Sequence, residues 1–258
     1  MHRKSICCIV AVILFLPLLS AAQAPAAGAA QSGPGRGGRG GPANVPRPRD
    51  DARHQDFVQI AKGGNIDLLF VGDSITDWFY WGLRGNPGTG RKVWDASFGS
   101  MNAANFGIAG DTTDGVLWRM QNGELEGFKA KLIVLMLGTN NINRNPNAEI
   151  VDGDRLIIEE FKKRQPQAKV MVLGVFPRSS NRQPEQTPAL RAAIKEVNAG
   201  LAELADNKQA FFIDIGDKFL AADGSIPADI MADGLHPTEK GYQIWADAIL
   251  PRVKELMK

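Results

Sequence analysis

Short apolar runs alternate with amphipathic stretches along most of this sequence. Five runs have the length and composition of β-strands, and they lie at 66–71, 103–106, 131–137, 169–175 and 210–215. Apolar residues also recur with helical spacing, which predicts helices at 53–62, 111–120, 149–165, 188–207 and 238–257. In the third run every residue after the first is apolar, which is typical of a strand buried on both faces. We expect Pro251 to interrupt the last helix.

Strands that alternate with helices favour a parallel sheet with right-handed crossovers. We therefore predict an α/β fold, a three-layer α/β/α sandwich around a flavodoxin-like parallel five-stranded sheet with strand order 2-1-3-4-5. The folded domain is expected to cover residues 51–258. In that order the first strand lies between the second and third, and ligands bind at the carboxyl ends of such strands.

The residues that follow the first strand provide a candidate nucleophile. The strand runs into Gly72, Asp73 and Ser74. A serine at this position is held by rigid structure and faces the ligand-binding edge of the sheet. If Ser74 is a nucleophile, the chain must also supply a base, an acid that orients the base, and donors for an oxyanion.

The histidines leave little choice of base. The chain has three, of which His2 lies in the N-terminal apolar segment and His54 borders a Gly/Pro/Arg-rich segment. His236 is therefore the candidate base. Asp233 lies three residues before it, in a Gly-containing turn, so its carboxylate can accept a hydrogen bond from Nδ1. The alternative is that Asp233 and His236 only shape this turn and cap the last helix.

Two further loops follow the strands that flank the first one. Gly107–Asp111 opens a helix, so its backbone N–H groups are exposed at a helix N-terminus. Gly138–Asn141 follows the third strand, and the amide of Asn140 can donate to a developing oxyanion. A tight turn at Gly110 and an Asx turn at Asn140 are the simpler interpretations. In the predicted strand order both loops lie beside Ser74.

Taken together, these blocks resemble the SGNH or GDSL-type hydrolase superfamily, named for Ser, Gly, Asn and His in four separate blocks. The matching residues are Ser74, Gly110, Asn140, and Asp233 with His236. Ile75 stands where the family name has leucine. The match spans about residues 66–248. Within the superfamily the chain is most similar to members like the catalytic subunits of platelet-activating-factor acetylhydrolase, over the stretches 105–111, 116–119, 122–125 and 164–168.

The resemblance implies a serine esterase that hydrolyses short-chain, above all acetyl, carboxylic esters without a metal or cofactor. By this likeness Ser74 attacks the acyl carbon, His236 is base and then acid, and Asp233 orients His236. The backbone N–H groups of Ser74 and Gly110 and the amide of Asn140 form the oxyanion hole. Substrates would be acetylated sugars, lipids or other short acyl esters. Because the related subunits form dimers, a homodimer is one candidate assembly.

Residues 1–24 have the pattern of a secretory signal peptide. A positive start precedes an apolar core at 6–19 and the small-residue site Ala22-Gln23-Ala24. A membrane anchor is the alternative, but the apolar core is short for a span. We expect an exported protein, periplasmic or extracellular, with no transmembrane span in the mature chain. Both cysteines lie in this segment, so the mature chain would carry no disulfide.

Residues 25–50 are rich in Ala, Gly, Pro and Arg, and we expect a disordered linker. Its arginines are compatible with binding to an anionic surface, although a solvated tether is the simpler interpretation. The net charge of +2 gives the folded part no broad basic field, so no nucleic-acid partner is expected. Asp152 and Asp154 are expected in a polar turn close to a helix rather than in a metal site.

A turn-rich stretch between the first two strands contains four aromatic residues that either line an acyl or sugar pocket or belong to the core: Trp78, Tyr80, Trp81 and Trp94. For the whole chain, the alternative to an esterase is a non-catalytic carbohydrate- or surface-binding module on the same fold. A binding module has no need for a nucleophile, a base, an orienting acid and an oxyanion donor together, so the set of motifs favours the enzyme.

Overall fold

Five short, mostly apolar strands form the centre of the structure. The computed structural model describes residues 41–82 and 88–258. The strands are β1 (Leu68–Gly72), β2 (Ala103–Gly107), β3 (Leu132–Met136), β4 (Lys169–Leu173) and β5 (Ala210–Ile213). All neighbours pair in parallel, in the order β2-β1-β3-β4-β5. The predicted fold class and strand order are therefore confirmed.

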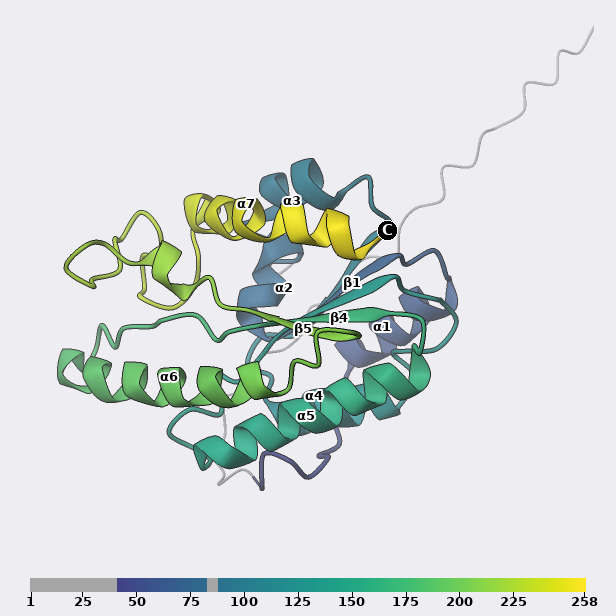
Figure 1. The fold of residues 1–258 in the computed structure, drawn as a ribbon, viewed down its shortest axis with the longest axis horizontal. Helices are drawn as coiled ribbons and strands as arrows, with labels where there is room; N and C mark the ends of the chain where they lie inside the picture. Colours follow the sequence, from purple (N-terminus) through teal and green to yellow (C-terminus); the bar gives the residue numbers. More distant parts are fainter. Residues whose placement is uncertain (1–40, 83–87) are drawn as a thin grey trace, which may run out of the picture.

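Helices cover both faces of the sheet (Figure 1). One layer consists of α1 (Ala52–Lys62), α4 (Thr113–Gln121), α5 (Asn147–Arg164) and α6 (Thr187–Glu203). The opposite layer consists of α2 (Ser74–Tyr80), α3 (Arg91–Phe98) and α7 (Glu239–Leu256). Two single 3₁₀ turns, Pro184–Gln186 and Gly216–Phe219, precede α6 and follow β5. Successive strand residues point into opposite layers, so every position of β1 and β3 is buried.

Two helices, α2 and α3, occupy the stretch for which the sequence predicted only turns. In α2 the apolar residues Ile75 and Phe79 are four positions apart, and both are buried against the sheet. In α3 the buried residues Val93, Trp94 and Phe98 have the same helical spacing. Both helices are short, so the many polar and glycine residues around them hid this pattern.

The predicted interruption of the last helix is also wrong, because α7 continues through Pro251 to Leu256. Pro251 is exposed, while Ile249 and Val253 on the opposite side of the helix are fully buried. Packing of that buried side keeps the helix continuous at a residue that lacks a backbone N–H.

The prediction of a disordered linker is wrong for residues 41–50. Ala43 is completely buried, and its carbonyl oxygen accepts a hydrogen bond of 2.6 Å from Thr113 Oγ1. The Asn44 amide donates to Asp152 at 2.7 Å, so Asp152 lies within α5 and not in a separate polar turn. Composition alone could not show that these residues have specific partners on the domain. The predicted signal peptide, 1–24, and the rest of the linker lie outside the described residues.

No helix in the described ranges has the length and apolarity needed to cross a membrane.

We predict that Gly107→Ala destabilises the protein, because α2 lies directly against the end of β2. A Cβ at Gly107 would lie 2.3 Å from the backbone nitrogen of Asp77, which cannot move without shifting the helix. The expected loss is about 3 kcal/mol in the free energy of unfolding, measured by urea denaturation. Gly41→Ala is the matched control, since no atom lies within 4 Å of a Cβ there. Equal stability of the two variants would contradict the close approach.

Candidate active site

Ser74 lies where β1 gives way to α2. Asp73 caps the helix, since its Oδ1 accepts the backbone N–H of Ile75 at 3.0 Å, and Ser74 is the first helical residue. The Ser74 hydroxyl oxygen lies 2.9 Å from Nε2 of His236, a residue 162 positions later in the chain. The predicted serine and histidine are therefore in hydrogen-bonding contact at the carboxyl ends of the strands, where ligands were predicted to bind.

Asp233 holds the other nitrogen of the His236 ring. Its Oδ2 lies 2.6 Å from Nδ1, and its Oδ1 accepts the backbone N–H groups of Leu235 and His236 at 2.9 and 2.7 Å. Gly234 has a φ of +74°, which allows the tight turn between the two side chains. The same carboxylate thus shapes the turn and contacts the imidazole. The last helix, however, is capped by Thr238, whose side chain accepts the Gly241 N–H, and not by Asp233 or His236.

These hydrogen bonds also favour the ionised form of the Asp233 carboxyl. Partial burial raises the pKa of this carboxyl, but hydrogen bonds from the His236 ring and from two backbone N–H groups outweigh it and hold the pKa below its usual value. The carboxylate is therefore ionised at neutral pH and accepts the Nδ1 proton. This tautomer leaves the lone pair of Nε2 facing the Ser74 hydroxyl.

Trp78 provides the surface on which the His236 ring rests. The indole lies one helical turn after Ser74, and the two rings stack with centroids 4.0 Å apart at 28°. The other aromatic residues from this stretch have different surroundings. Trp94 is buried in the core, the Trp81 indole donates to the Asn105 carbonyl at 2.8 Å, and Tyr80 packs under Arg91. Ser74 and Trp78 are four residues apart, so they lie on the same face of a helix. This spacing could have distinguished Trp78 from the other three aromatic residues as a neighbour of the site.

The Gly110 loop, residues 108–112, lies between β2 and α4. Gly110 has a φ of +79°, a conformation that favours glycine. The Ala109 N–H donates to Asp77 Oδ2 on α2 at 3.1 Å, which fastens the loop beside the helix that begins with Ser74. Asn140, after β3, donates from Nδ2 to the Asp111 carbonyl at 2.9 Å. The structure therefore brings Gly110 and Asn140 to the same edge of the sheet as Ser74.

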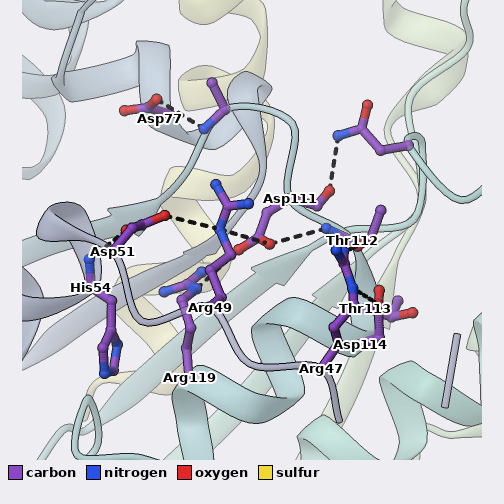
Figure 2. Close-up of polar contacts among 12 residues, drawn as sticks. Arg47, Arg49, Asp51, His54, Asp77, Asp111, Thr112, Thr113, Asp114 and Arg119 are labelled. Carbon is purple, nitrogen blue, oxygen red and sulfur yellow. Dashed lines mark hydrogen bonds and ion pairs between the residues drawn. The ribbon is translucent and has the colours of Figure 1, made fainter. Parts of the chain in front are cut away.

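A set of buried polar side chains is linked to the Gly110 loop, and Figure 2 shows Asp111, Arg119 and His54 among them. Arg119 donates from Nε to Asp111 Oδ2 at 2.9 Å, and from its Nη atoms to Glu124 and to the Phe106 carbonyl. The His54 Nδ1 lies 2.8 Å from Glu124 Oε1. Sequence analysis missed this set. The available signal was an arginine in α4 three residues after a core valine, a position that faces the interior.

Two buried acids lack full hydrogen bonding. Burial, with the nearby charge of Asp111, raises the pKa of Asp73 to about 7 against the hydrogen bond from Ile75. Asp154 lies within α5 rather than in the predicted polar turn, and neither of its carboxyl oxygens has a partner in the part of the chain that the structure describes. Burial and the charge of Asp73 raise the pKa of Asp154 well above its ordinary value. Within residues 41–82 and 88–258, no three His, Cys, Asp or Glu side chains are grouped to hold a metal ion.

Comparison with known proteins identifies the class of this fold and site. A family model described as GDSL-like lipase/acylhydrolase matches residues 70–244. The alpha2 subunit of platelet-activating factor acetylhydrolase IB from Rattus norvegicus is 37% identical over 217 residues, which cover 80% of this chain and 87% of that protein. The chain belongs to the GDSL-like lipase/acylhydrolase family, within the SGNH superfamily, and is a carboxylic ester hydrolase.

Solved structures agree on the fold. A GDSL-like lipase from Bacteroides thetaiotaomicron superposes with a TM-score of 0.60 at 18% identity, covering 76% of this chain and 90% of the other. An acetylxylan esterase from Geobacillus stearothermophilus superposes with a TM-score of 0.58 at 21% identity, covering 75% and 96%. Enzymatic family membership removes the main reason for the alternative of a non-catalytic binding module.

We predict that Asp73→Asn stabilises the protein in a pH-dependent way. Since the pKa of Asp73 rises from 3.8 to about 7 on folding, the wild type loses stability as the pH rises from about 4 to about 7, and the loss persists above that range. Asparagine keeps the capping oxygen but does not ionise. The difference in unfolding free energy between variant and wild type should grow from pH 4 to pH 8 by up to roughly 4 kcal/mol.

Denaturant titrations at the two pH values measure this difference. Asp206→Asn is the control, because hydrogen bonds from Lys162 and from backbone N–H groups lower the pKa of Asp206. Its pH dependence therefore lies mainly below pH 4, and its effect on the unfolding free energy should change little between the two pH values. A pH-independent effect of Asp73→Asn would show that Asp73 is ionised throughout.

We predict that Trp78→Ala lowers kcat/KM for p-nitrophenyl acetate about tenfold, because the His236 ring loses the face against which it stacks. Trp78→Phe retains an aromatic face and should lose less. Tyr80→Ala is the matched control on the same helix, since Tyr80 packs against Arg91 instead. Equal losses in the Trp78→Ala and Tyr80→Ala variants would indicate that the effect comes from general damage to α2.

Proposed function

We propose that this enzyme is an exported serine esterase that hydrolyses short-chain, above all acetyl, esters with Ser74, His236 and Asp233 as its catalytic triad. The assignment of the triad depends on one observation. Three side chains from two distant parts of the sequence form a continuous hydrogen-bonded chain, with contacts of 2.9 and 2.6 Å. Export rests on the pattern of residues 1–24 alone.

In the first half of the reaction, the Ser74 oxygen attacks the ester carbonyl carbon while His236 Nε2 takes the hydroxyl proton. The Asp233 carboxylate stabilises the imidazolium that forms. The negative oxygen of the tetrahedral intermediate is held by the backbone N–H groups of Ser74 and Gly110 and by the Asn140 amide. His236 then gives its proton to the departing alcohol, which leaves an acyl group on Ser74.

In the second half, His236 takes a proton from a water molecule, whose oxygen attacks the acyl carbon. The intermediate collapses, the Ser74 oxygen leaves with the proton from His236, and a carboxylic acid is released. Asn140 is suited to its role, because an amide nitrogen carries two protons. One donates to the Asp111 carbonyl and fixes the plane of the amide, so the other, which has no partner among the described residues, can donate to the oxyanion.

The acetyl preference is supported by the names of two relatives. The rat protein is described as an acetylhydrolase of platelet-activating factor, and the Geobacillus protein as an acetylxylan esterase. Their alcohol groups differ, a lipid in one case and a sugar in the other, while the acetyl group is shared. Release of acetate from acetylated xylan and from an acetylated ether phospholipid would distinguish the two kinds of alcohol for this enzyme.

We predict that the wild type hydrolyses p-nitrophenyl acetate and butyrate faster than the laurate ester, and that Ser74→Ala falls to the uncatalysed rate. Asn140→Ala should keep the triad and lower kcat by about 10²–10³. Initial rates of p-nitrophenol release across the ester series measure both. Residual turnover by Ser74→Ala comparable to that of the wild type would contradict the assignment of the nucleophile, and a preference for laurate would contradict the short-chain proposal.

A further inference from the structure

Two aspartates fix the Gly110 loop: Asp111, which is part of the loop, and Asp77, which binds the loop from α2. Each of them pairs with an arginine from the N-terminal part of the described chain. Asp111, within the loop, forms an ion pair with Arg49, and Asp77, on α2, pairs with Arg53. Both arginines precede β1, outside the four sequence blocks that contain the proposed catalytic residues. Both arginines therefore act on the Gly110 loop. This loop contains one proposed oxyanion donor, Gly110, and accepts a hydrogen bond from the other, Asn140.

Asp111 connects the buried charges to the oxyanion donors (Figure 2). Its side chain is 0% exposed, with Oδ2 2.9 Å from Arg119 Nε and Oδ1 3.3 Å from Arg49 Nε. Its backbone carbonyl accepts the Asn140 amide at 2.9 Å, and its neighbour in the chain is Gly110. A displacement of the Asp111 carbonyl therefore changes the direction of the Asn140 amide, whereas the residue before Gly110 is fastened separately, by the hydrogen bond from the Ala109 N–H to Asp77.

Arg119 by itself cannot balance the charge around Asp111. It also pairs with Glu124, so two fully buried carboxylates share one guanidinium, and apart from Arg49 their other partners are His54 Nδ1 on Glu124 and the Thr112 N–H on Asp111. A buried carboxylate without sufficient positive charge or hydrogen bonding is strongly destabilised. Arg49 supplies a second, permanent positive charge on the open side of Asp111, where its own side chain remains 25% exposed.

The second anchor acts through α2. Asp77 accepts the Ala109 N–H on Oδ2 at 3.1 Å and the Arg53 Nη2 on Oδ1 at 3.1 Å. The Arg53 guanidinium also lies over the Trp81 ring, 4.3 Å from its centroid, so it is held in one place. Asp77 therefore binds the residue before Gly110 with an orientation that Arg53 sets.

We propose that Arg49 and Arg53 are positioning residues of the oxyanion hole, which fix Asn140 and Gly110 through Asp111 and Asp77. Arg49 acts on Asn140 by way of the Asp111 carbonyl. Arg53 acts on Gly110 by way of the Ala109 N–H. The inference rests on the proposed function, since it requires that Gly110 and Asn140 stabilise the oxyanion.

The test is the kinetics of Arg49→Gln and Arg53→Gln with p-nitrophenyl acetate, in the full chain. Because oxyanion contacts are strongest in the transition state, each variant should lower kcat about tenfold and change KM less than about twofold, against about 10²–10³ in kcat for removal of a whole donor. Arg49→Lys keeps the charge and should lose only about threefold.

Combination with Asn140→Ala separates positioning from general stability. Once the Asn140 amide is absent, Arg49→Gln should cost less than about threefold, whereas Arg53→Gln should keep its tenfold cost because it acts through Gly110. Arg164→Gln is the matched control. Its side chain is 26% exposed and pairs with Glu160 at 2.8 Å. It is the last residue of α5, just before β4 begins, so it lies toward the amino ends of the strands, away from Ser74, and kcat should be unchanged.

Three results would overturn the inference: an unchanged kcat in Arg49→Gln, an equal loss in Arg164→Gln, or the same factor for Arg49→Gln with and without Asn140. Melting temperatures of all variants identify losses caused by unfolding. If Arg49→Gln does not fold, the threefold loss in Arg49→Lys, and its disappearance in the Asn140→Ala background, decide the question. A wild type that neither hydrolyses the ester nor reacts at Ser74 with a fluorophosphonate would overturn the proposed function and the inference with it.

Discussion

The register between β1 and β2 is the constraint on which the site depends, because it places two glycines side by side. Gly72 and Gly107 are paired at the carboxyl ends of these strands, and neither has room for a Cβ. At Gly72 the nearest atom would be the Thr76 side chain, and at Gly107 the Asp77 backbone. Because these two positions have no side chains, α2 can pack directly against the ends of β1 and β2. This packing places Ser74, the first residue of α2, at the carboxyl end of β1. A slip of one residue would put side chains under the helix.

Most of the sheet could be predicted from the sequence because its signal is local. A run such as 131–137 is apolar wherever it folds, and five such runs separated by helical stretches leave few topologies. The sequence also suggested candidate site residues, because each of them follows a strand or precedes a helix in a motif of fixed spacing: Ser74, Gly110, Asn140, Asp233 and His236. The structure adds what spacing cannot give, which is the contact between Ser74 and His236 across the whole domain.

What the sequence could not show depends on partners far away in the chain. A segment rich in Gly, Pro and Arg suggests disorder when its composition is considered alone. Arg49 is nevertheless ordered by Asp111, 62 positions later, and Ala43 is buried by Thr113. The same holds for the Arg119–Glu124 pair. The sequence does not show that Arg119 also binds Asp111 in the Gly110 loop, and this contact exists only in the folded structure. Aromatic residues show the converse, since Trp78 and Trp94 look alike in sequence and only one of them touches His236.

The hydrogen bond from the Tyr242 hydroxyl to the Ile75 carbonyl, at 2.8 Å, ties the last helix to the first turn of α2. Tyr242 and Ile75 are 167 residues apart, so the loop that this contact closes spans most of the protein. Closing a loop of this length costs conformational entropy, and contacts between residues so far apart in the sequence slow folding. Without α7, α2 would keep its packing against Trp94 and Phe98 of α3 but would lose the contacts of Phe79 with Tyr242 and Trp245. Because His236 lies just before this helix, docking of α7 on α2 and formation of the contact between Ser74 and His236 are coupled.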